Sequence, residues 1–223
     1  VPYGDLVLTS AAFREGHPPR AVLQVGGRFA SKRLRLFLRD SAPEVWAVVR
    51  PDPSRIDPDH RVTHHVEAAV PAAVDALVAR LEEGPRGTTW RDDWAGASER
   101  VGAVVQAHVQ ESDALTDPLV AALLTEEMPS EHALVAASSM PVRDLNRHAA
   151  PGGTGGPAFA NRGASGIDGT VATAAGIAEG RDGPVTLLIG DLALQHDLNG
   201  LALLQDRPVV AIVVNNDGGG IFH

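Results

Sequence analysis

The chain has 223 residues, a formal net charge of -9 and a pI of about 5.4, and 44% of its residues are hydrophobic. This acidic surplus disfavours binding to nucleic acid or to an anionic membrane, because both need a cationic protein face. The absence of cysteine excludes disulfides and thiolate metal sites. No apolar run is long enough to span a bilayer and no signal peptide is evident, so we expect a cytoplasmic protein.

The first part of the chain alternates buried strands with amphipathic helices. The predicted elements are a strand at 21–27, a helix at 32–39 capped by Ser31, a strand at 45–49, a proline-rich loop at 50–65 and a helix at 70–82. Residues 83–96 are rich in Gly, Arg, Asp and Trp, which favours a linker. We therefore predict two domains, 1–95 and 96–223.

The second part repeats the alternation. The predicted elements are helices at 97–111 and 117–124, a strand at 133–137, a glycine-rich loop at 150–156, a small-residue helix at 169–179, and strands at 185–189 and 209–214 joined by a helix through 194–204. Strands that alternate with helices form parallel βαβ units. The predicted fold class is therefore α/β, with open parallel sheets and flanking helices.

Polar residues follow three of these strands. Ser139, Asp191 and Asn216 each lie two residues beyond the end of a predicted strand, and ligands of open α/β sheets bind outside the carboxyl ends of the strands. A carboxylate and a carboxamide are hard oxygen ligands suited to Mg²⁺, and the Gly218 carbonyl can add another. The alternative is that these residues form ordinary turns, since short motifs have many false positives.

The last third of the chain carries the motifs of a known family. Gly190-Asp191-Leu192 followed by Asn215-Asn216 resembles the signature of thiamine-diphosphate enzymes. The blocks at 161–169, 190–201 and 213–222 are similar to the 2-succinyl-5-enolpyruvyl-6-hydroxy-3-cyclohexene-1-carboxylate (SEPHCHC) synthases. This resemblance implies a thiamine-diphosphate-enzyme fold, of which the chain would hold most of the central domain and the first part of the diphosphate-binding domain.

The resemblance assigns roles by position. It implies Mg²⁺ or Mn²⁺ ligands at Asp191, Asn216 and Gly218, and thiamine-diphosphate contacts at Ile167, Gly190, Asp191, Leu192, Asn216 and Gly218. It implies substrate contacts at Lys32, Arg33, Ser139, Arg143, Arg162, Ile221 and Phe222. The family's substrates are dianions, and arginine binds carboxylates with two hydrogen bonds. The alternative for Lys32 and Arg33 is a solvated helix face, and for Arg143 a surface position.

The resemblance also implies an activity. The implied enzyme is a transferase of menaquinone biosynthesis that decarboxylates 2-oxoglutarate and adds the succinyl unit to isochorismate. Its implied cofactors are thiamine diphosphate and Mg²⁺. Its implied assembly is a homodimer or homotetramer. The family's activating glutamate lies in a preceding domain of a partner subunit, so we expect no catalytic residue in this chain and no activity from it alone. The alternatives are another thiamine-diphosphate keto-acid enzyme, or a non-catalytic cofactor-binding fragment.

Two features remain open. Asp217 stands where the family pattern has Asn, and an extra carboxylate there either strengthens cation binding or repels the diphosphate. The histidines show no convincing ligand spacing, so we interpret them as solvated or structurally satisfied, with His196 the one nearest the expected diphosphate.

Overall fold

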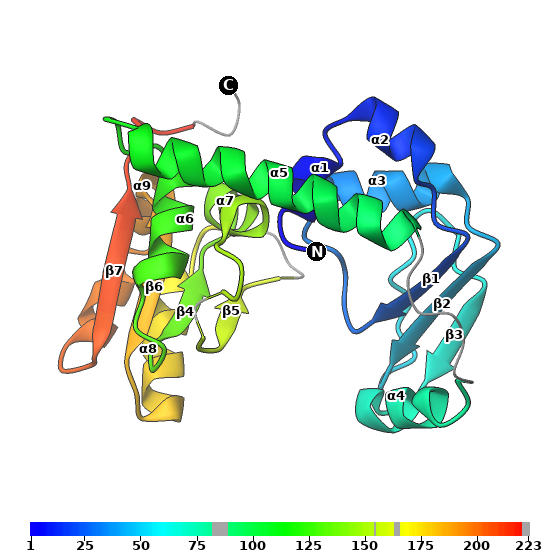
Figure 1. The fold of residues 1–223 in the computed structure, drawn as a ribbon. Coiled ribbons are helices and arrows are strands. Elements are labelled where there is room, and N and C mark those ends of the chain that lie inside the picture. The colour runs from blue at the N-terminus through cyan, green and yellow to red at the C-terminus, as the bar shows by residue number, and fades with distance from the viewer. Residues whose placement is uncertain (82–88, 154, 163–165, 220–223) are drawn as a thin grey trace. The chain divides into compact units, whose positions relative to one another are not determined.

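The computed structural model describes residues 1–81, 89–153, 155–162 and 166–219 (Figure 1). The chain forms two compact units, one containing Tyr3–Val101 and the other Gly102–His223. The division falls inside one long helix, α5 (Thr89–Glu111), six residues beyond the boundary that the composition indicates. The two domains at 1–95 and 96–223 remain a prediction.

The first unit is a three-stranded parallel sheet with helices. Its elements are α1 (Gly4–Val7), α2 (Ala11–Gly16), β1 (Ala21–Val25), α3 (Lys32–Ser41), β2 (Val45–Arg50), β3 (His64–Glu67), α4 (Val70–Val78) and the first part of α5, and its strand order is β1-β2-β3. The sequence patterns locate β1, α3, β2 and α4. They miss α1, α2 and β3, which are too short to show a clear hydrophobic period.

One face of this sheet is the core of the first unit. Trp46 and Val48 on β2 pack with Phe37 of α3 and Trp94 of α5. The other face is more open: Leu23 and Val25 on β1 are 50% and 44% exposed. The prediction of a buried strand at β1 is therefore wrong in its burial, because an apolar run shows that a strand forms but not whether both its faces are covered.

The predicted linker is partly helical. Residues 82–88 lie outside the described part of the chain, but α5 already begins at Thr89. Trp94 makes an edge-to-face contact with Phe13 at a centroid distance of 5.0 Å and a tilted contact with Trp90 at 5.6 Å. This aromatic packing stabilises helix where the composition alone indicates a loop.

The second unit is a four-stranded parallel sheet with helices on both faces, which leave the edge strand β7 partly exposed. Its elements are the end of α5, α6 (Asp117–Glu127), β4 (Ala133–Ala136), α7 (Met140–His148), β5 (Ala158–Ala160), α8 (Thr170–Arg181), β6 (Val185–Gly190), α9 (Asp191–His196), a 3₁₀ helix η1 (Leu198–Leu204) and β7 (Val209–Val214), and its strand order is β5-β4-β6-β7. Residues of α8 and α9 pack on one face, and those of α6 and α7 on the other. Figure 1 shows α6 and α8 on opposite sides of the strands.

The patterns predict most of the second unit. They locate α6, β4, α8, β6 and β7 to within a few residues, and they miss α7 and the three-residue β5. The predicted helix through 194–204 is divided in the structure, because α9 ends at His196 and η1 follows. Gly200 lies in η1 with Asp197 and Val171 close by, so tight packing shapes this turn. In the described part of the chain, no helix is long and apolar enough to cross a membrane.

Candidate active site

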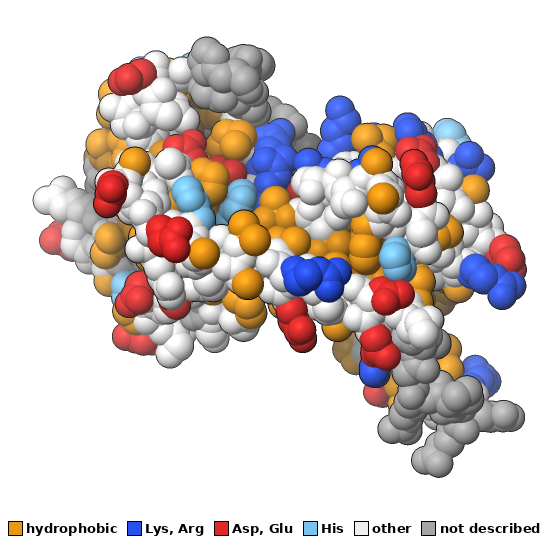
Figure 2. All heavy atoms as spheres, turned by 45° about the horizontal axis from the view of Figure 1, so that its top comes forward, with side chains coloured by type: hydrophobic (Ala, Val, Ile, Leu, Met, Phe, Trp, Pro, Cys, Tyr) orange, Lys and Arg blue, Asp and Glu red, His pale blue; other side chains and the backbone are white. Residues whose placement is uncertain are grey.

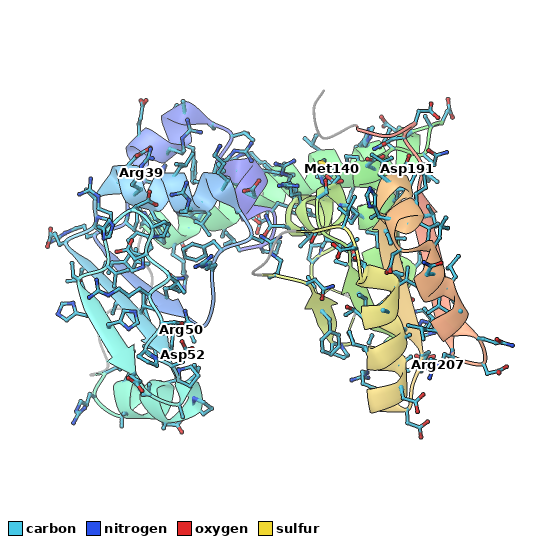
Figure 3. The ribbon with its side chains drawn as sticks, turned by 180° about the vertical axis from the view of Figure 1, so that it is seen from behind. Arg39, Arg50, Asp52, Met140, Asp191 and Arg207 are labelled. Atoms are coloured by element: carbon cyan, nitrogen blue, oxygen red, sulfur yellow. The ribbon has the colours of Figure 1, made fainter. Side chains whose placement is uncertain are left out.

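The carboxyl ends of the four strands of the second unit form one edge. Register pairs align Ala136 of β4 with Ala160 of β5 and with Leu188 of β6, and Gly190 of β6 with Val214 of β7. The residues that follow each strand are therefore brought together in the order β5, β4, β6, β7. In Figure 3, Asp191 and Met140 lie at the same end of this unit, and Arg207 lies at the opposite end.

The register of β6 and β7 places Asp191 and Asn216 after the ends of neighbouring strands, and their role as metal ligands stays a prediction. Asp191 follows Gly190 as the first residue of α9, and Asn216 comes two residues after Val214, the register partner of Gly190. Asp191 is half-buried and Asn216 is exposed. In the described residues, no group of three His, Cys, Asp or Glu side chains could hold a metal. A cation here would thus take one carboxylate, one amide and a backbone carbonyl, a donor set that suits Mg²⁺ with a diphosphate supplying further oxygens.

The turn after β7 has a conformation that requires glycine at one position. Gly218 has a φ of 78°, and a β-carbon added there would lie 3.4 Å from the Leu192 side chain. Asp217, with a φ of 61°, donates its backbone N–H to the Asn215 side chain at 3.0 Å. The turn therefore packs on the start of α9 through Leu192, and its left-handed backbone favours glycine.

Ser139 has a strained backbone. Its φ of 73° and ψ of -129° lie in a region that non-glycine residues rarely occupy, and it directly precedes α7. Next to it, the Ser138 hydroxyl donates to the Asn161 carbonyl at 3.4 Å, which connects the ends of β4 and β5. Such strain is held by the surrounding structure and concentrates at functional positions, and a substrate contact at Ser139 stays a prediction.

Arg143 and Arg162 are exposed cations of the second unit. Arg143 lies in the first turns of α7 and Arg162 follows β5, two residues after Ala160. Within the described residues, neither side chain forms an ion pair, so both guanidinium groups are available to an anionic ligand. Ile167 is partly buried against the core formed by α8 and the sheet. The structure thus brings Arg162, Ser139, Asp191 and Asn216 to one edge.

Two carboxylates near this edge were not singled out by the sequence patterns. Asp117, the first residue of α6, accepts a hydrogen bond from Asn216 Nδ2 at 3.0 Å. Asp144 on α7 is 3% exposed, and its burial, followed by the charge of Asp117, raises its pKa to about 6. Neither carboxylate has a local sequence signal, because α7 is not predicted from the sequence and Asp117 meets Asn216 across 99 positions.

The remaining predicted residues lie elsewhere. Lys32 is exposed at the start of α3 in the first unit, and Arg33 is held by Asp5, whose carbonyl accepts from Arg33 Nη1 at 2.9 Å and whose carboxylate accepts at 2.5 Å. Arg33 thus has a structural partner, and substrate contacts at both positions stay predictions. Ile221 and Phe222 lie outside the described residues.

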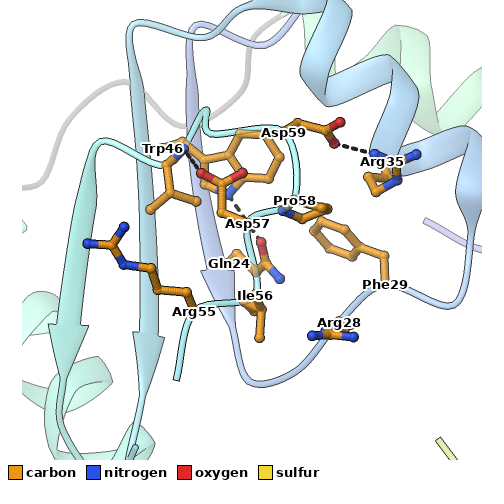
Figure 4. A pocket seen from close by; sticks show the side chains of 11 residues that line it. Gln24, Arg28, Phe29, Arg35, Trp46, Arg55, Ile56, Asp57, Pro58 and Asp59 are labelled. Atoms are coloured by element: carbon orange, nitrogen blue, oxygen red, sulfur yellow. Dashed lines mark hydrogen bonds and ion pairs between the residues drawn. The ribbon is translucent and has the colours of Figure 1, made fainter. Parts of the chain in front are cut away.

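The first unit contains a separate cavity of about 270 Å³ (Figure 4). It is lined by Gln24, Arg28, Phe29, Arg35, Trp46, Arg55, Ile56, Asp57, Pro58, Asp59 and Val62. Arg35 is paired with Asp59, and Trp46 donates its indole N–H to Gln24 at 3.2 Å. The hydrogen bond to Gln24 therefore fixes the Trp46 side chain in the cavity wall, and Asp59 neutralises the charge of Arg35.

These features define a class of protein. Residues 1–135 match the family model described as "Middle domain of thiamine pyrophosphate", and the chain belongs to this family of thiamine-pyrophosphate-enzyme domains. A protein from Mycobacterium smegmatis, whose X-ray structure is described as that of a thiamin diphosphate-dependent enzyme, shares the fold. The TM-score is 0.57 at 20% sequence identity, over 88% of this chain and 37% of that one.

Within that class the similarity is to one kind of synthase. The chain is 51% identical over 222 residues to the 2-succinyl-5-enolpyruvyl-6-hydroxy-3-cyclohexene-1-carboxylate synthase of Rubrobacter xylanophilus, covering 100% of this chain and 38% of that protein. The synthase of the same name from Chlorobium phaeobacteroides is 38% identical over 220 residues, covering 97% of this chain and 37% of the relative. The chain thus spans less than two-fifths of the length of these relatives.

Proposed function

We propose that this chain is the cofactor-holding part of a SEPHCHC synthase, which decarboxylates 2-oxoglutarate and adds the succinyl unit to isochorismate in menaquinone biosynthesis. The observation that carries the proposal is the placement of Asp191 and Asn216 after the register-paired ends of β6 and β7. The 51% identity to a synthase of that name supports the choice of reaction. The homodimer or homotetramer implied by the family resemblance stays a prediction.

Asp191, Asn216 and the Gly218 carbonyl would hold Mg²⁺ or Mn²⁺, which in turn binds the diphosphate of thiamine diphosphate. The cofactor supplies the carbon–carbon chemistry when it is bound, and the protein supplies binding, orientation and electrostatics. In this arrangement Ile167, half-buried at the same edge, offers an apolar contact, and Leu192 supports the glycine turn.

Arg143 and Arg162 are the residues we propose for the substrate carboxylates. A dianionic keto acid needs more than one cation, and these two guanidinium groups are exposed and form no ion pair within the described ranges. Ser139 has a strained backbone and lies between the end of β4 and the start of α7. Its hydroxyl would donate or accept a hydrogen bond near Arg143 and Arg162.

Calorimetric titration with thiamine diphosphate and Mg²⁺ tests the cofactor site. Asp191→Ala is expected to remove measurable binding, because the site loses its only carboxylate ligand. Asp113→Ala, which removes an exposed carboxylate elsewhere in the same unit, is expected to bind as the unchanged protein does. Equal binding by both variants would contradict the metal assignment.

Substrate preference separates the synthase from other keto-acid enzymes. In the protein that carries this chain, Arg162→Ala and Arg143→Ala are expected to raise the KM for 2-oxoglutarate at least tenfold, because a carboxylate loses its charged partner. The change at the arginine that binds the distal carboxylate should leave the KM for pyruvate unaltered, because pyruvate lacks that group, whereas the change at the other arginine should raise both KM values. If the unchanged protein prefers pyruvate, the alternative of another thiamine-diphosphate keto-acid enzyme is favoured. If it binds the cofactor without turnover, the alternative of a non-catalytic cofactor-binding fragment is favoured.

A further inference from the structure

Asn216 is held by a residue far from it in sequence. Its side-chain Nδ2 donates to Asp117 Oδ2 at 3.0 Å, across 99 positions of the chain. Asp117 begins α6, which packs on the sheet through Leu124, as does Met128 directly after the helix. The hydrogen bond therefore connects the turn after β7 to a helix anchored in the core.

This contact fixes which end of the amide faces the cation edge. A carboxylate oxygen only accepts hydrogen bonds, so the NH₂ group of Asn216 must be the end that meets Asp117. The Oδ1 atom of Asn216 is then not bonded to Asp117. This oxygen is the atom of the amide that coordinates a hard cation. An amide on an exposed turn would otherwise rotate among several rotamers.

The rest of the turn is fixed independently. The backbone N–H of Asp217 donates to Asn215 Oδ1 at 3.0 Å, and Gly218 packs near Leu192. The backbone of the turn thus has its own restraints, and the Asp117 contact acts on the side chain of Asn216. The Asp117 carboxylate also adds a negative charge next to Asn216.

We propose that Asp117 is a positioning residue of the cation site, which orients Asn216 so that Oδ1 is presented to the metal. This inference rests on the proposed function, because it takes Asn216 as a ligand. Asp117 itself touches neither metal nor diphosphate in this assignment. Groups that orient metal ligands typically contribute 10–100-fold to metal affinity.

The test measures Mn²⁺ binding by electron paramagnetic resonance in the protein that carries this chain, with thiamine diphosphate at saturation. Asp117→Ala is expected to weaken Mn²⁺ binding about 10–100-fold. Asp117→Asn is expected to recover most of the affinity, because its side-chain oxygen still accepts from Asn216. Asp113→Ala serves as the control, and far-UV circular dichroism shows whether each variant is folded.

A double-mutant comparison separates positioning from a general structural role. In an Asn216→Ala background, Asp117→Ala should weaken Mn²⁺ binding no further, since its effect passes through Asn216. Additive losses of Mn²⁺ affinity in the double variant would overturn the positioning role alone. The same holds if Asp117→Ala binds Mn²⁺ like the control while Asn216→Ala binds it weakly. Unchanged binding in Asp191→Ala and Asn216→Ala would overturn the proposed cation site, and this inference with it. If Asp117→Ala does not fold, the comparison of Asp117→Asn with Asp117→Ser decides, because a serine hydroxyl is too short to reach Asn216.

Discussion

Asp144 makes stability depend on pH. Its carboxyl group is buried at 3% exposure, and burial with the neighbouring Asp117 charge raises its pKa from 3.8 to about 6. An acid with a higher pKa in the folded chain binds its proton more tightly there than in the unfolded chain. The free energy of unfolding is therefore expected to fall as pH rises from about 4 to about 6, by at most about 3 kcal/mol from this group.

Asp144→Asn is expected to remove that decline. The variant should unfold at higher urea than the unchanged protein at pH 7.5 and at nearly the same urea at pH 4, followed by far-UV circular dichroism. Tryptophan fluorescence would not serve, because all three tryptophans, at 46, 90 and 94, lie in the first unit. Parallel stability profiles for Asp144→Asn and an Asp113→Asn control would show that the carboxyl is solvated.

Asp5 anchors the start of α3. Its buried carboxylate accepts from the Ser31 hydroxyl and from Arg33, while the Ser31 hydroxyl in turn accepts from the Leu34 N–H at 2.9 Å. Asp5→Ala is expected to destabilise the first unit by about 2–4 kcal/mol, because it breaks a largely buried pair and leaves Arg33 partly desolvated. Urea unfolding monitored by tryptophan fluorescence measures this loss.

Asp40→Ala is the matched control for this change. Asp40 is an exposed carboxylate on the same helix that pairs with its neighbour Arg39, and such surface pairs contribute little. A loss for Asp5→Ala no larger than for Asp40→Ala would show that the buried pair is not formed. The prediction of Arg33 as a substrate contact did not anticipate Asp5, since no sequence pattern reveals a pairing between residues 28 positions apart.

At the scale of elements, α8 is capped from another part of the chain. Gly169, which precedes the helix, has no side chain to cap it, and the Asp197 carboxylate accepts from the N–H groups of Val171 at 2.5 Å and Ala172 at 3.4 Å. Asp197→Ala is expected to cost about 1–2 kcal/mol, as the loss of a helix cap does. Asp197→Asn should cost less because its oxygen still accepts, and an Asp197→Ala variant as stable as Asp113→Ala would contradict the cap.

Elements were predictable where their signals are local. The hydrophobic runs of β2, β4, β6 and β7 and the cap at Ser31 were read correctly because each depends on neighbouring residues. The start of α5 depends on contacts of Trp94 with Phe13, 81 positions away, so composition indicated a linker instead. Likewise the strand ends single out Asp191 and Asn216 in the sequence, whereas Asp117 and Asp197 form hydrogen bonds with residues far along the chain and carry no local signal.

At the scale of the whole molecule, apolar surface remains exposed in both units. On β7, Val210 is 53% and Val213 is 40% exposed, and Leu23 of β1 is 50% exposed. Figure 2 shows hydrophobic side chains between scattered charges on one face of the molecule. Among the described residues β7 pairs only with β6, so its outer edge has free backbone groups, which is a feature that favours association with other chains.

The 223-residue chain is therefore expected to associate as its concentration rises. The double change Val210→Lys and Val213→Lys should reduce this association, because charged side chains on an edge strand oppose strand pairing and remove apolar surface from both faces. Sedimentation velocity at about 5 and 100 µM measures it, with Leu115→Lys, which replaces an exposed leucine outside the sheet, as control. A monomer at both concentrations would show that this edge is inert. Association that Leu115→Lys reduces as much as the double change would show that general hydrophobicity, and not the β7 edge, drives it.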